Sequence, residues 1–263
     1  MNDASLVTYQ AVDGIACITL TDPPANAYTH AMMRALDEAI LKARFADDIH
    51  VLLLAGAGEK MFCAGANITE LQRMEPRFKD NFCLHANETL NRLEQTPKLV
   101  IAALNGHCVG GGLEVALAAD LRVARRDGGK IGLPEVKLGV LPGTGGTQRL
   151  LRSVGRSRAL EMMVTGRLYN FEQAAAFGLI HEILPGENFQ EEALAYARGF
   201  TPPHGASLAV GAIKRAVVSG AEMGFSEGLA LERELQSRLF RSSDSAEGLA
   251  ANREKRAPNF TGS

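Results

Sequence analysis

The stretch LVIAALNGHCVGGGLEVALAADLRVAR, residues 99–125, places a strand, a glycine turn, a helix and a further strand in close succession. The apolar run at 99–104 predicts a buried strand, and the Leu, Val and Ala residues after three consecutive glycines predict a helix that begins at the turn. A second strand is predicted at 121–125. Such alternation is typical of an α/β architecture, in which loops at one end of the strands gather ligand-binding groups.

The N-terminal side of this stretch continues the alternation. A tight turn at Asp13-Gly14 between two short strands predicts a hairpin, and Thr29 can cap the helix that follows. The predicted elements there are strands at 7–10, 15–20 and 50–56, helices from Thr29 to about Phe45 and from about Arg77 to Leu93, and a loop rich in glycine and alanine at 56–66.

The C-terminal side changes character. From about Phe189 onward the strand signals stop, and helices are expected at 190–199, 206–218, 225–240 and 244–256. Four leucines at positions 229, 231, 235 and 239 supply an apolar face. This face can close a self-packed subdomain or serve oligomerisation, and the pattern leaves both open.

The composition limits the classes of partner. With 263 residues, 46% hydrophobic residues and a net charge of -2, the chain can bury a sizeable core and has no overall attraction to nucleic acid or an anionic membrane. Its four cysteines form no C-x-x-C pair, so neither a metal site nor a disulfide framework is expected. The N-terminus lacks the basic start and apolar run of a signal peptide, and no stretch reaches membrane-spanning length. We therefore expect a cytoplasmic protein.

Glu114 is a lone acid in the first turn or so of a helix otherwise made of Leu, Val and Ala. A carboxylate in apolar surroundings is costly, and its place near a helix start lowers that cost only in part. Proton transfer therefore explains it better than a helix cap does. The three glycines before it can present N–H groups to an anion or oxyanion, or can simply form a tight turn.

Glu135 is a second lone acid, in the segment GLPEVKLG at 132–139, where Pro134 fixes the backbone beside it. Taken alone, this segment favours a structural role for Glu135, as an N-terminal helix residue or a partner of Lys137. Two such acids after neighbouring strands favour an acid/base pair. The small residues of the loop at 62–68 allow a second close approach of backbone N–H groups to a ligand.

Three segments make a family resemblance specific. CAGANI at 63–68, NGHCVGGGLEVALAADLRVA at 105–124 and GLPEVKLGVLPGTGGTQRL at 132–150 resemble, in order and spacing, the signature segments of the enoyl-CoA hydratase/isomerase (crotonase) family. The likeness extends from DPPANA near the start to EKRAPNF at 254–260. It implies an α/β fold, a spiral of ββα units over residues 1–200, followed by a C-terminal helical trimerisation region at 201–263, in a homotrimer or homohexamer.

The resemblance also implies roles for individual residues. The backbone N–H groups of Ala66 and Gly111 would hold the thioester oxygen, Glu114 would help activate water, and Glu135 would deliver or remove the α-carbon proton. The residues implied to contact substrate and coenzyme A are Asn26, Ala27, Ala64, Gly65, Ala66, Ile68 and Lys255. The chain departs from typical short-chain hydratases at Thr69, where lysine is common, and at Asn252, where an aromatic residue is frequent.

The reaction implied is hydration of a trans-2-enoyl-CoA to a 3-hydroxyacyl-CoA. No cofactor is expected, because coenzyme A is part of the substrate. Double-bond isomerisation and decarboxylation are the alternatives within the family, and a non-catalytic RNA-binding member would need a basic surface. His107, beside the glycine turn, is expected to be structural.

Overall fold

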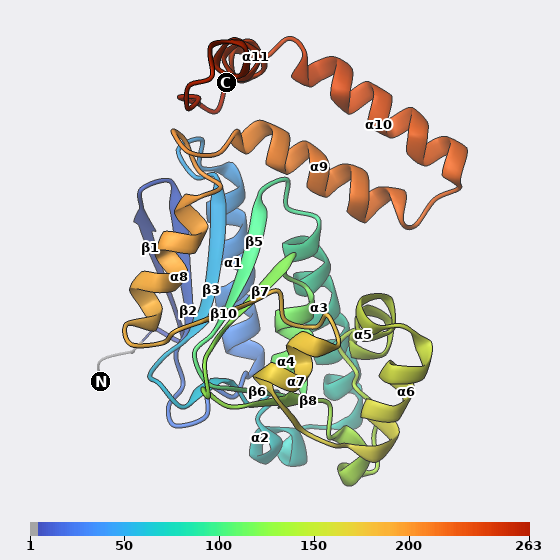
Figure 1. Cartoon of the computed structure of the whole chain (residues 1–263). Helices are drawn as coiled ribbons and strands as arrows, with labels where there is room; N and C mark the ends of the chain where they lie inside the picture. The colour runs from blue at the N-terminus through green and yellow to red at the C-terminus, as the bar shows by residue number, and fades with distance from the viewer. Residues whose placement is uncertain (1–4) are drawn as a thin grey trace.

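Two sheets, built from the same repeating unit, form the body of the molecule (Figure 1). In the computed structural model, which describes residues 5–263, the larger sheet has the strand order β1-β2-β3-β5-β7-β10 and the smaller the order β4-β6-β8-β9. The strands are β1 (Val7–Val12), β2 (Ile15–Leu20), β3 (Val51–Gly56), β4 (Met61–Cys63), β5 (Leu99–Leu104), β6 (His107–Val109), β7 (Leu121–Arg125), β8 (Lys130–Gly132), β9 (Tyr169–Asn170) and β10 (Glu182–Leu184).

The helices connect and cover these sheets. They are α1 (His30–Phe45), α2 (Ile68–Arg73), α3 (Pro76–Glu94), α4 (Gly111–Leu117), α5 (Gly146–Val154), α6 (Arg156–Thr165), α7 (Phe171–Ala176), α8 (Phe189–Arg198), α9 (Ser207–Gly220), α10 (Phe225–Leu239) and α11 (Ser243–Glu254), with a 3₁₀ helix at Glu135–Leu138. The predicted hairpin is confirmed, since β1 and β2 pair antiparallel around Asp13-Gly14. The predicted cap is also confirmed, since the Thr29 hydroxyl oxygen accepts a hydrogen bond from Met32 N at 3.1 Å.

The first unit places both of its strands, β1 and β2, in the larger sheet and is followed by α1. Each of the next three units adds a long strand to the larger sheet, a short strand to the smaller sheet, and then a helix. β3 and β4 are followed by α2, β5 and β6 by α4, and β7 and β8 by the 3₁₀ helix. At Gly106 the chain passes so close to the β3–β4 connection that an added Cβ would lie 2.2 Å from Lys60 C. This close passage directs the chain from β5 into β6. The ββα spiral that the resemblance implied is therefore observed.

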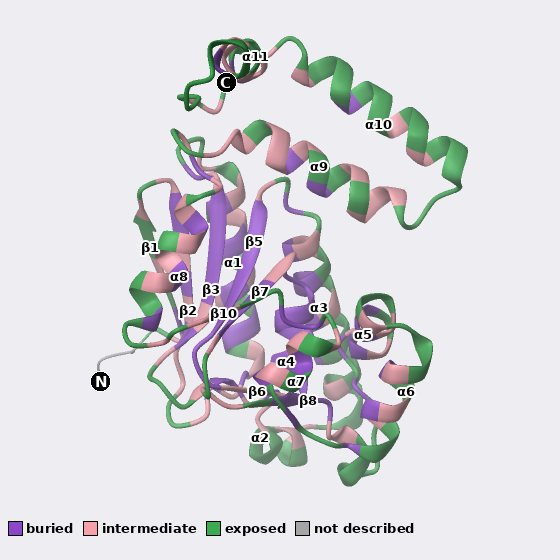
Figure 2. Cartoon of the chain, viewed as in Figure 1, coloured by how far each residue is buried: buried purple, intermediate pink, exposed green. Residues whose placement is uncertain are grey.

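Apolar side chains fill both faces of the larger sheet. One cluster includes buried residues of α1, α3 and α4 together with residues of the larger sheet, and β5 is buried along its whole length (Figure 2). A second cluster packs Phe189, Ala193 and Ala197 of α8 against the opposite face. α4 is buried at every residue, so its only acid, Glu114, is fixed inside the protein.

The last three helices lie at one end of the body (Figure 1). α9 buries Gly211 and Lys214, whereas α10 buries only Leu235 and is otherwise exposed or half-buried (Figure 2). None of the helices described is long and apolar enough to cross a membrane.

Candidate functional site

Both predicted acids face one cavity, of about 570 Å³, beside the smaller sheet. The loop after β4, the start of α4, helix α3 and the segment from Pro134 to Thr144 enclose it. Its walls include Ala64, Gly65, Ala66, Ile68, Gly111, Glu114 and Glu135. The structure therefore gathers most of the predicted site residues from three separate ββα units.

Glu114 is 2% exposed and is held by three donors. Its Oε1 atom accepts hydrogen bonds from Thr144 N at 2.8 Å and Gly146 N at 2.7 Å. Its Oε2 atom accepts the hydroxyl of Thr144. Every contact uses the carboxyl group as an acceptor, which is the pattern of an ionised carboxylate.

Glu135 has the opposite environment. It is the first residue of the 3₁₀ helix, and its Oε2 atom is buried without a hydrogen-bond partner in the described chain. Burial raises the pKa of Glu135 to about 7, and the charge of Glu114 acts in the same direction. A proton near neutral pH is therefore available on this side chain. No ion pair with Lys137 forms within residues 5–263, so the alternative of a Lys137 partner is not supported.

The backbone N–H groups of Ala66 and Gly111 have no acceptor among the described residues. The two loops touch, because a Cβ added at Gly65 would lie 2.7 Å from Gly111 N. Gly65 has φ +92°, a conformation that glycine adopts without strain. Two free donors on touching loops are the arrangement that binds an oxyanion.

Two hydroxyl residues of this cavity were not singled out from the sequence. Tyr28, 3% exposed, lies against Gly111, and its hydroxyl oxygen is 3.4 Å from Thr144 Oγ1. Burial raises the pKa of Tyr28 well above its usual value. Both residues sit in ordinary-looking loops of the sequence, and Thr144 is distant from Tyr28 along the chain. No local signal marks their proximity.

Other predicted residues lie outside the cavity. The Asn26 side chain is buried and its amide nitrogen donates to Ala57 O and Met61 O, both at 2.9 Å, while its backbone N–H donates to Asp22 O at 2.7 Å, so these groups are not free for a ligand. Neither it nor Ala27 lines the cavity. Lys255 follows α11 in the C-terminal region. His107 Nδ1 accepts from Lys130 N at 2.9 Å, a structural contact as expected.

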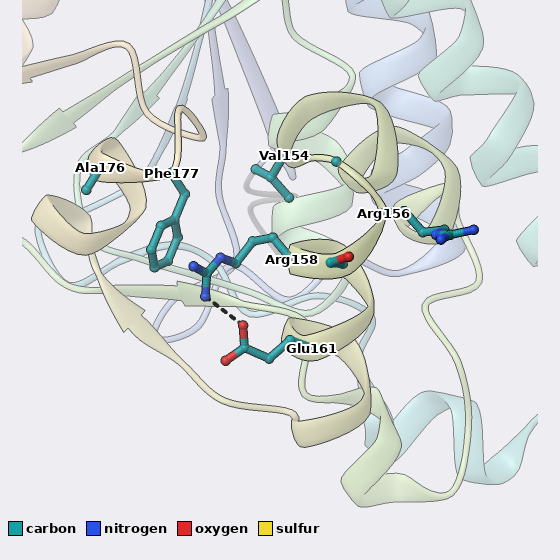
Figure 3. A pocket seen from close by; sticks show the side chains of 8 residues that line it. Val154, Arg156, Arg158, Glu161, Ala176 and Phe177 are labelled. Atoms are coloured by element: carbon teal, nitrogen blue, oxygen red, sulfur yellow. Dashed lines mark hydrogen bonds and ion pairs between the residues drawn. The ribbon is translucent and has the colours of Figure 1, made fainter.

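A second hollow of about 580 Å³ lies between α5, α6 and α7 (Figure 3). There the Arg158 guanidinium pairs with Glu161 at 2.6 Å and covers the Phe177 ring. This pairing leaves no free acid for proton transfer. Within residues 5–263, no cluster of three or more His, Cys, Asp or Glu side chains is placed to hold a metal ion. The cavity with Glu114 and Glu135 is therefore the candidate active site.

Comparison with known proteins shows the family to which the chain belongs. The family model described as enoyl-CoA hydratase/isomerase matches residues 10–263. A relative from Bacillus subtilis, named as an enoyl-CoA hydratase/isomerase, is 38% identical over 100% of both chains. The (E)-benzylidenesuccinyl-CoA hydratase of Thauera aromatica is 36% identical over 97% of this chain and 99% of its own. A crystal structure of an enoyl-CoA hydratase from Geobacillus kaustophilus matches with a TM-score of 0.95 and 45% identity, covering 100% of this chain and 98% of that one.

Proposed function

Because the chain belongs to the enoyl-CoA hydratase/isomerase family, we propose that it adds water across the double bond of a trans-2-enoyl-CoA to give a 3-hydroxyacyl-CoA. One observation carries this proposal. Two acids face the same cavity, and one accepts hydrogen bonds from three donors while the other holds a proton near pH 7. Hydration needs a base for water and an acid for the α-carbon, and this pair supplies both.

The proposed reaction starts at the thioester oxygen, which accepts the N–H groups of Ala66 and Gly111. This draws electrons toward the carbonyl, so the β-carbon becomes electrophilic. Glu114 takes a proton from water as the water oxygen bonds to the β-carbon. The electron pair of the double bond moves to the α-carbon, where Glu135 delivers its proton. The pair of acids holds one proton before and after the step.

The proposal also covers the cofactor requirement, the coenzyme A contacts, the assembly and the location. The thioester is its own electron sink, so the reaction needs no metal or redox cofactor, and coenzyme A enters with the substrate. We assign coenzyme A contacts to the main chain at Ala64, Gly65 and Ile68, and one phosphate contact to Lys255 of a neighbouring copy. The proposed assembly is a homotrimer or a pair of trimers, located in the cytoplasm. In each chain the ββα body ends at residue 200, and the C-terminal helical trimerisation region begins at residue 201.

The test is direct. Purified protein is mixed with crotonyl-CoA and longer or branched trans-2-enoyl-CoAs, and the absorbance of the conjugated enoyl thioester is followed. We expect it to fall with at least one substrate, and Glu114→Gln and Glu135→Gln each to lower turnover by about 10²- to 10⁴-fold. Binding of a saturated acyl-CoA should change little. No absorbance change with any substrate would contradict hydration, and a rise with a 3-enoyl-CoA would indicate isomerisation instead.

A further inference from the structure

Glu114 belongs to a chain of hydroxyl groups that the proposed reaction does not use. The Thr144 hydroxyl contacts Glu114 Oε2, and Tyr28 Oη lies 3.4 Å from Thr144 Oγ1. All three residues are at most 5% exposed. Tyr28 immediately precedes the Thr29 cap of α1, Thr144 precedes α5, and Glu114 lies in α4, so three elements meet at this chain.

The direction of the hydrogen bonds follows from their partners. An ionised carboxylate only accepts, so the Thr144 hydroxyl proton must point to Glu114. The Thr144 oxygen then accepts, and the Tyr28 hydroxyl is the donor. Thr144 also donates its backbone N–H to Glu114 Oε1. Because Thr144 contacts both carboxyl oxygens, it sets the rotation of the carboxylate plane.

The remaining acceptor capacity of Glu114 is small. A carboxylate offers about four lone-pair sites. Thr144 N and Gly146 N occupy both sites on Oε1, and the Thr144 hydroxyl occupies one on Oε2. A single site on Oε2 remains for a water molecule. Its direction is fixed for as long as Thr144 holds the carboxylate.

Tyr28 links this chain to the two oxyanion donors. Its backbone pairs with the loop of Ala66, since Tyr28 N donates to Gly65 O at 2.8 Å and Asn67 N donates to Tyr28 O at 2.9 Å. Its ring lies so close to Gly111 that an added Cβ there would be 2.2 Å from the Tyr28 hydroxyl oxygen. Tyr28 therefore contacts both loops that supply the proposed oxyanion donors, Ala66 and Gly111. Through Thr144 it is also linked to Glu114, the proposed base.

We propose that Tyr28 and Thr144 are positioning residues. Their hydroxyl groups form a hydrogen-bonded chain, the hydroxyl relay, which holds the Glu114 carboxylate so that one acceptor site faces the attacking water. This inference rests on the proposed function for its kinetic consequence, whereas the position of the carboxylate can be tested without turnover. The 3.4 Å contact of Tyr28 is longer than most O–H···O bonds. Thr144 therefore contributes more than Tyr28 to holding the Glu114 carboxylate in position.

The kinetic test uses Thr144→Val, Thr144→Ser, Tyr28→Phe and the double variant Tyr28→Phe/Thr144→Val. Loss of a hydrogen bond to a charged group should lower kcat about tenfold to a hundredfold in Thr144→Val, with KM changed less than about threefold. Thr144→Ser restores the hydroxyl and should restore kcat. Tyr28→Phe should lose about two- to tenfold. The double variant should lose no more than Thr144→Val alone, because Tyr28 acts through Thr144.

Two matched controls remove hydroxyls elsewhere. Tyr169→Phe deletes a buried hydroxyl that has no hydrogen-bond partner among residues 5–263, and Thr165→Val deletes a hydroxyl at the end of α6. Both should keep the kcat of the unmodified protein. Thermal unfolding of every variant shows whether a loss of kcat accompanies a loss of structure. If the fold-loss of kcat in the double variant equals the product of the fold-losses in the two single variants, Tyr28 does not act through Thr144. The proposed relay would then be wrong.

Crystal structures of the variants separate this inference from the proposed function. In Thr144→Val the Glu114 carboxylate should rotate away from its present plane, and in Thr144→Ser it should return. If the unmodified protein hydrates no enoyl-CoA but the carboxylate moves as described, the function is wrong and the positioning role stands. If the protein is an active hydratase but Thr144→Val keeps both its kcat and its carboxylate orientation, the function stands and the relay is overturned.

Discussion

Glu114 and Glu135 have the same side chain, and the protein gives them opposite surroundings. Three donors converge on Glu114, whereas one buried oxygen of Glu135 has no hydrogen-bond partner in the part of the chain that the structure describes. The donors come from Thr144 and Gly146 at the start of α5, whereas the cavity lining around Glu135 includes the apolar side chains of Leu138, Val140 and Leu141. Two identical groups thus become suited to different steps, one to accept a proton and one to give it.

The pH dependence of turnover tests this division. The pKa of Glu135 is raised from 4.5 to about 7, so its proton is lost as the pH rises through about 7. Since the pair must hold one proton in either direction, kcat/KM for hydration and for the reverse dehydration should both fall about tenfold per pH unit above this point. The measurement is initial rate between about pH 6 and 9 in both directions. A flat profile across that range would show that Glu135 is not the proton donor.

Glu114 could be predicted from the sequence, because a single Glu among Leu, Val and Ala is conspicuous, whereas Glu135 becomes a candidate only as the second of two such acids after neighbouring strands. The roles of Tyr28 and Thr144 could not. A hydroxyl residue is unremarkable in a loop, and its function arises only when folding brings distant segments within hydrogen-bond reach. The unequal burial of the two acids likewise depends on the packing of the 3₁₀ helix against the rest of the wall.

At the scale of elements, the position of α4 depends on Gly112. A Cβ added there would lie 2.1 Å from the carbonyl oxygen of Cys63, which is backbone of β4 and cannot move aside alone. Gly112→Ala should therefore separate α4 from β4, lower the free energy of unfolding by about 1–3 kcal/mol and reduce turnover together with it. Denaturant unfolding and kcat measure the two effects.

The control for this change is Gly220→Ala, at the end of α9, where an added Cβ meets nothing within 4 Å. It should be neutral or slightly stabilising, because alanine favours a helix over glycine. Equal stability of Gly112→Ala and Gly220→Ala would contradict the close packing of α4 against β4.

The longer helices and strands could be predicted from the sequence, because each has enough residues to show a recognisable pattern of apolar side chains. The strands at 99–104 and 121–125 agree with β5 and β7 residue for residue, and α3 differs from its predicted range by one residue at each end. The smaller sheet was missed. β4, β6 and β8 have three residues each, too few to show an alternation, and they form only because the larger sheet directs the chain into them.

At the scale of the whole molecule, a buried ion pair joins the C-terminal helices to the body. Lys214 Nζ on α9 lies 2.8 Å from Asp120 Oδ2 and donates to Lys98 O at 3.0 Å. Burial raises the pKa of Asp120 and lowers that of Lys214, so each charge depends on the other. Lys214→Met leaves the Asp120 charge unpaired and should lower the free energy of unfolding by about 3–5 kcal/mol.

A double variant isolates the charge effect. Lys214→Met/Asp120→Asn removes both charges and should be more stable than Lys214→Met alone in urea unfolding at fixed protein concentration. Arg158→Met breaks an exposed pair with Glu161 and should cost at most about 1 kcal/mol. If Lys214→Met cost no more than Arg158→Met, the pair would not anchor α9.

The same helices leave apolar side chains without partners in the single chain, which favours assembly. Ile213, Val217, Phe225, Phe240 and Leu249 are each at least 60% exposed. These exposed side chains agree with the proposed homotrimer or pair of trimers, so we expect light scattering to give three copies of the 28.1 kDa chain, 3 × 28.1 or about 84 kDa, or twice that mass. Phe225→Ser should lower the mass without unfolding the chain, because this side chain is 84% exposed and contributes little to the core. Leu160→Ser on α6, 57% exposed, should keep the full mass. A single-chain mass for the unmodified protein at micromolar concentration would exclude the trimer.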